Sequence, residues 1–134
     1  MKRALLLAIL ILTCTGCDRV VDLVKDATME PEDIVVDYVL SISDIYSSES
    51  DCDELAKKLS VYCERREEKV TKAISDMLLR IENNRIDAAK RNEIYDKLSE
   101  IKKAHNTSCT ISPRVLSEMA ICSKPVLNVI GKIK

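Results

Sequence analysis

The sequence predicts an all-α protein, a small antiparallel bundle of three to four helices with two disulfides. Turn-forming residues are scarce, with two Gly and three Pro in 134 residues, fewer than a β-sandwich or a Rossmann-type fold would need. Apolar residues recur at helical spacing over most of the chain after residue 30. Phe and Trp do not occur and Tyr occurs four times, so the core is expected to be aliphatic.

The first predicted helix begins at Pro31 and runs to about Tyr46. Proline suits the first helical turn, and the acidic Glu32 and Asp33 favour a helix N-terminus. The apolar positions of this helix are Val35, Tyr38, Val39, Ile42, Ile45 and Tyr46.

The second predicted helix, over 51–82, is the longest periodic stretch. It follows a polar break at 47–51 that offers good N-cap residues. Its apolar stripe consists of Cys52, Leu55, Leu59, Tyr62, Cys63, Val70, Ala73, Ile74, Met77, Leu78 and Ile81. The opposite face carries oppositely charged residues four apart, which predicts the ion pairs Glu54–Lys58, Glu68–Lys72 and Asp76–Arg80.

Two further helices are predicted after the turn signal at 83–84. The third begins near Asp87 and frays after Ala104, with Ala88, Arg91, Ile94, Tyr95, Leu98 and Ile101 on one side. The fourth has Ser112 as N-cap and Pro113 in its first turn. It places Val115, Leu116, Met119, Ala120 and Cys122 on its apolar face and is expected to end before Pro125, after which residues 126–134 pack as a strap.

The N-terminal segment has the pattern of a secretory signal. A basic start at 1–3 precedes nine unbroken apolar residues at 4–12, and small residues follow at 13–16. Nine residues span roughly 14 Å as a helix, too short for a permanent transmembrane segment.

The residues at the end of this signal, Cys14-Thr15-Gly16 followed by Cys17, resemble the lipobox of bacterial lipoproteins. Cys14 departs from that pattern, which favours Leu there. The resemblance implies a signal peptide over 1–16 and lipidation of Cys17 with acyl chains such as palmitate. It also implies a tether over 17–30 and a helical domain over 31–134. The protein would then be anchored to a membrane of the cell envelope, facing the periplasm or the cell surface.

Four cysteines remain in the predicted domain: Cys52, Cys63, Cys109 and Cys122. An even number in an exported chain favours disulfides, and gaps of 11 and 13 residues are unlike the close pairs of a zinc site. Cys52 and Cys63 cannot pair, because one continuous helix separates them by about 16 Å.

Two disulfide pairings stay open. If the fourth helix runs parallel to the second, Cys52 pairs with Cys109 and Cys63 with Cys122. If it does not, the nested pairing of Cys52 with Cys122 and Cys63 with Cys109 results. Residues 106–112 are enough for a chain reversal, which favours the first pairing.

The sequence shows no motif for chemistry. The 21 basic and 22 acidic residues are interspersed, which argues against a nucleic-acid partner. His105, the only histidine, lies where the third helix should end, and the residue spacing identifies no nucleophile or orienting partner for it. We therefore predict no catalytic residue, no metal site and no cofactor. Asn106-Thr107-Ser108 matches an N-glycosylation sequon.

The function expected from these features is that of a non-catalytic, membrane-tethered envelope lipoprotein that binds another envelope protein through a surface of its helical bundle. Two alternatives stay open. One is a carrier of a lipid or small molecule in an aliphatic cavity between helices. The other is an envelope enzyme or an accessory to one.

Overall fold

The computed structural model describes residues 28–133, and the chain divides into two units, Met1–Glu30 and Pro31–Lys134. The second unit consists of α3 (Pro31–Ser48), α4 (Cys52–Glu82), α5 (Ala88–Ser99), the short 3₁₀ helix η1 (Glu100–Lys103) and α6 (Pro113–Ile133). Residues 28–133 contain helices and no strand, and the predicted all-α class is confirmed. The predicted signal peptide, Cys17 and most of the predicted tether lie outside the described residues.

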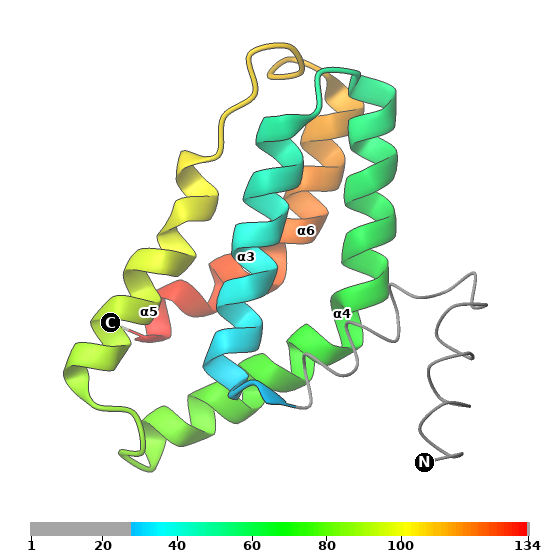
Figure 1. The fold of residues 1–134 in the computed structure, drawn as a ribbon. Coiled ribbons are helices and arrows are strands. Elements are labelled where there is room, and N and C mark those ends of the chain that lie inside the picture. The colour runs from blue at the N-terminus through cyan, green and yellow to red at the C-terminus, as the bar shows by residue number, and fades with distance from the viewer. Residues whose placement is uncertain (1–27, 134) are drawn as a thin grey trace, which may run out of the picture. The chain divides into compact units, whose positions relative to one another are not determined.

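The four long helices alternate in direction along the chain, as Figure 1 shows. α3 packs against α4 and α5, and α6 packs against the same two helices from the other side. Helices that follow one another in sequence are therefore antiparallel, whereas α4 and α6 run side by side in the same direction. This parallel arrangement was the condition for pairing Cys52 with Cys109.

The core is aliphatic, and every long helix contributes to it. The fully buried large side chains are Val35, Val39 and Ile42 of α3, Leu55, Leu59, Val70 and Met77 of α4, Ile94 and Leu98 of α5, and Val115, Val126 and Ile133 of α6. Leu116 and Ala120, predicted on the apolar face of the fourth helix, are instead exposed. The buried face of α6 consists instead of Val115, Cys122, Ser123, Val126, Val129, Ile130 and Ile133.

Local capping residues mark the helix ends. Asp51 accepts a hydrogen bond from the Glu54 N–H at 2.9 Å, and Asp87 accepts one from the Lys90 N–H at 2.7 Å. Asn84 follows α4 with a φ of 54°, a left-handed conformation that asparagine tolerates. The third helix differs from the prediction, because α5 ends at Ser99 and the tighter η1 takes its place to Lys103.

The predicted end of the fourth helix before Pro125 is wrong, because α6 continues to Ile133. Pro125 has no N–H to donate to the carbonyl of Ile121, and α6 changes direction between its orange and red parts in Figure 1. Four buried side chains hold the second half of the helix on the core: Val126, Val129, Ile130 and Ile133. Their burial outweighs the loss of one helical hydrogen bond.

Three cations of α4 have partners other than those predicted. The ion pairs are Lys58–Glu49 at 2.6 Å, Arg80–Glu32 at 3.3 Å, and Lys72–Asp76. Two of these join α4 to α3 or to the loop after it. An exposed pair within one helix contributes only a few tenths of a kcal/mol, so a well-placed carboxylate on a neighbouring element competes easily.

Candidate functional site

Two disulfides join α4 to the C-terminal part of the chain. They pair Cys52 with Cys109 and Cys63 with Cys122, with Cα–Cα distances of 5.4 and 5.5 Å. The favoured pairing is therefore confirmed, and the nested pairing is wrong. All four sulfurs are in S–S bonds, so they do not form the zinc site considered as an alternative.

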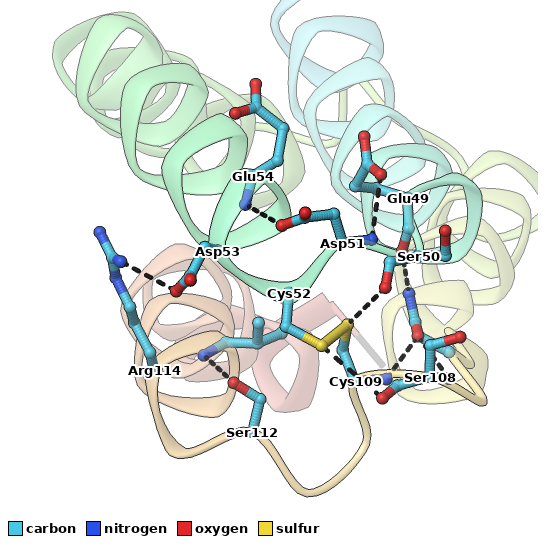
Figure 2. Close-up of a disulfide and its surroundings, with 12 residues drawn as sticks. Glu49, Ser50, Asp51, Cys52, Asp53, Glu54, Ser108, Cys109, Ser112 and Arg114 are labelled. Atoms are coloured by element: carbon cyan, nitrogen blue, oxygen red, sulfur yellow. Dashed lines mark hydrogen bonds and ion pairs between the residues drawn. A yellow bond between two sulfur atoms is a disulfide. The ribbon is translucent and has the colours of Figure 1, made fainter.

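The first disulfide closes one end of the bundle. Figure 2 shows Cys52 at the start of α4 bonded to Cys109 in the loop that precedes α6. On the outer side of the bond, Arg114 donates a hydrogen bond to Asp53 at 3.1 Å. Ser112 Oγ accepts from the N–H of Val115 and caps α6. The loop is thus tied both to α4 and to the helix that follows it.

Asn106 holds the same loop by four hydrogen bonds. Its amide nitrogen donates to the carbonyls of Tyr46 and Glu49, both at 2.6 Å. Its Oδ1 accepts from the N–H groups of Ser108 at 3.0 Å and Cys109 at 2.8 Å. The side chain is buried, and the nitrogen that a glycan would need is already bonded twice. The sequon motif therefore has a structural role in this fold.

A groove of about 320 Å³ lies between α4 and α6 and is open to solvent. Cys63 of the second disulfide and Tyr38 of α3 line it, together with Ser60, Glu64, Glu67, Val70, Glu118, Ile121 and Pro125. The groove therefore lies beside the Cys63–Cys122 disulfide, which joins the two parallel helices. Three glutamates give it an acidic lining.

Tyr38 is the buried polar group beneath this groove. Its hydroxyl donates to the carbonyl of Cys122 at 2.9 Å, in the part of α6 where Pro125 interrupts the helical bonding. Burial, with smaller contributions from Tyr62 and the negative charge of Glu67, raises the pKa of Tyr38 to about 12, and Arg66 opposes this. Tyr38 is therefore neutral and a hydrogen-bond donor at physiological pH.

A second hollow of about 380 Å³ lies on the other flank of α4, against α3, and is wider open. Its lining contains Val61 with three basic residues, Lys57, Lys58 and Arg65, and one acidic residue, Glu54. The Arg65 guanidinium lies 5.7 Å from the centre of the Tyr62 ring, a cation–π distance. The two flanks of α4 thus differ in charge.

His105 is exposed just beyond η1. In residues 28–133 no group of three or more His, Cys, Asp or Glu side chains is placed to hold a metal ion. Over the same residues, no helix has the length and apolar content to cross a membrane.

The sequence predicted neither the four hydrogen bonds by which Asn106 holds its loop nor the groove between α4 and α6. Asn106 had a local signal, because an asparagine whose oxygen accepts from the N–H groups two and three residues later is a common turn motif. The groove had none, because its glutamates come from helices far apart in the sequence. Comparison of the chain with protein-family models, with curated proteins and with solved structures gives no match.

Proposed function

We propose that the chain is a lipid-anchored protein of the bacterial cell envelope that binds another envelope protein through the surface of its helical domain, and that it does not catalyse a reaction. The observation that carries the proposal is the pair of disulfides, Cys52–Cys109 and Cys63–Cys122, in a small aliphatic bundle. Disulfides of this kind persist in oxidising compartments such as the periplasm and cell surface. In this proposal the signal peptide that ends in the lipobox-like residues directs the chain out of the cytoplasm, and lipidation of Cys17 anchors it to the membrane.

The anchor would act through acyl chains on Cys17. Each buried methylene contributes about 0.8 kcal/mol, so two or three chains make attachment effectively permanent. A domain held at the membrane in this way meets its partner in two dimensions, and a modest affinity is then enough. The rigid, twice-stapled bundle would present a fixed surface to that partner.

The test of the anchor is the intact mass of the protein purified from membranes. A mature chain that begins at Cys17 with two or three acyl chains supports the proposal. Cys17→Ser should abolish the acyl mass and release the protein from the membrane fraction. Cys14→Ser is the matched control, because Cys14 lies within the removed segment. A mature chain without acyl groups, or one cut at another site, would contradict the proposal.

The compartment is tested by thiol labelling of the same sample. Four additional thiols should become reactive only after reduction and denaturation. Labelling without reduction would place the domain in a reducing environment.

The binding role is tested by photo-crosslinking in cells. Crosslinking residues at positions on α4 and α6 are expected to form specific adducts with an envelope protein.

A further inference from the structure

We propose that the groove between α4 and α6 receives a basic amphipathic segment of the partner protein, in which Lys or Arg side chains flank an aliphatic one. The inference rests on the proposed function, and names the surface and the partner chemistry that the role would use. Three properties of the groove carry it: unneutralised charge, a surplus of hydrogen-bond acceptors, and an exposed apolar wall.

The charge comes from Glu64 and Glu67 of α4 and Glu118 of α6. None of these three carboxylates has an ion-pair partner within residues 28–133. Some surface carboxylates elsewhere are paired, as where Glu93 lies between two lysines and Glu100 pairs with a third, so the groove is distinguished by three unpaired carboxylates that line one hollow. The groove therefore presents negative charge that a cationic ligand would neutralise.

The groove offers acceptors and few free donors. Pro125 has no N–H, so the carbonyl of Ile121 lacks its usual helical bond, and both residues line the groove. The Tyr38 hydroxyl, a donor that also lines the groove, is already bonded to the Cys122 carbonyl. Carboxylates and carbonyls are matched best by ammonium and guanidinium groups, which donate hydrogen bonds and accept none.

The apolar wall favours a peptide over a free cation. Ile121 is 61% exposed and forms this wall with the partly buried Pro125, whereas the Val70 side chain that also lines the groove is buried. The α4 residues that line it run from Ser60 to Val70, a distance of about 15 Å along the helix. Glu64 and Glu67 lie one turn apart, so a bound helix with basic residues three or four apart could face both.

The test is a titration with a fluorescent peptide of about 14 residues built from Leu, Lys and Arg at helical spacing, and with its Leu/Glu counterpart. The basic peptide should bind and the acidic one should not. The triple variant Glu64→Gln, Glu67→Gln, Glu118→Gln should weaken binding at least tenfold. A matched variant with the same loss of charge outside the groove, Glu68→Gln, Glu82→Gln, Asp96→Asn, should change it less than threefold.

The contribution of the apolar wall is tested separately. Ile121→Ala should weaken binding of the basic peptide several-fold, while the exposed Leu79→Ala on α4 should leave it unchanged. Equal weakening by the two triple variants would overturn the inference, because the attraction would then be general. Full competition by spermidine at matched charge would overturn it too, because the groove would then be a site for cations only.

Failure of this inference is distinguishable from failure of the proposed function. A photo-crosslinking residue is placed at Ile121 in the groove and, in a second strain, at Val61 on the basic flank of α4. Adducts with an envelope protein from Ile121, together with peptide binding, support the inference. Adducts from Val61 alone support the proposed function and overturn the inference. Absence of adducts from both positions counts against the proposed function itself.

Discussion

Replacement of Asn106 by alanine should destabilise the domain by about 3 kcal/mol, with both disulfides intact. The substitution removes four hydrogen bonds, so the buried polar groups of Tyr46 and Cys109 and the partly buried carbonyl of Glu49 lose their partner. A typical hydrogen bond contributes about 1 kcal/mol net, and an unsatisfied buried partner costs at least as much. Four bonds would together contribute about 4 kcal/mol. The expected loss is about 3 kcal/mol because water can replace Asn106 at the partly exposed groups of the loop.

Urea unfolding followed by far-UV circular dichroism measures this change. With a slope of about 1.5 kcal/mol per molar urea for a domain of this size, the midpoint should fall by about 2 M. Asn106→Asp should be at least as damaging, since it keeps the acceptor but brings a negative charge against two carbonyls. Asn128→Ala, at an exposed position of α6, is the matched control and should shift the midpoint by less than about 0.3 M. If Asn106→Ala behaved like that control, the loop would be held by the disulfide alone and our account would be refuted.

Three further outcomes are expected in the same unfolding assay. Removing one staple with Cys52→Ala and Cys109→Ala should lower stability by about 4 kcal/mol, the chain-entropy value for a sequence separation of 57 residues, and a change under about 1 kcal/mol would contradict that account. Because Tyr38 keeps its proton to about pH 12 when folded and loses it near pH 10 when unfolded, its contribution is complete below pH 10 and is lost as the pH rises toward 12. The wild type should therefore lose about 1.4 kcal/mol more than Tyr38→Phe between pH 9 and 11, and parallel curves would disprove the assignment. Glu32→Gln, which weakens a buried ion pair, should cost about 1 to 2 kcal/mol, whereas the exposed Glu82→Gln should have no measurable effect.

The features that could be predicted from the sequence depend on residues close together in the chain. Asp51 caps α4, and the bonds involved lie within three residues. The disulfides are the exception, because their cysteines are 57 and 59 residues apart: the spacing left two pairings open, and the chain reversal expected at 106–112 favoured the observed one. Asn84 marked a turn because few other residues adopt its backbone conformation.

The features that were mispredicted depend on contacts between distant segments. Pro125 would end an isolated helix, but the buried side chains of 126–133 hold the continuation of α6 on the core. Lys58 and Arg80 were assigned partners on their own helix, whereas Glu49, in the loop after α3, pairs with Lys58 and Glu32 of α3 pairs with Arg80. The α4/α6 groove exists because these two helices lie side by side, which brings Glu64 and Glu118 into one lining, and no local pattern encodes that placement.

Both disulfides span α5, and neither involves it. The covalent links join α4 to the segment from Cys109 to Cys122, so residues 83–108 contain no disulfide, and α5 packs against α3 and α6. Within α5 that packing amounts to two buried side chains, Ile94 and Leu98. Regions with few buried contacts open at lower free energy than the rest of a fold. We therefore expect α5 amides to exchange with solvent well before those of α4 and α6. The two disulfides cross-link α4 to α6 and to the loop before it, whereas α5 can open locally while these cross-linked parts stay folded.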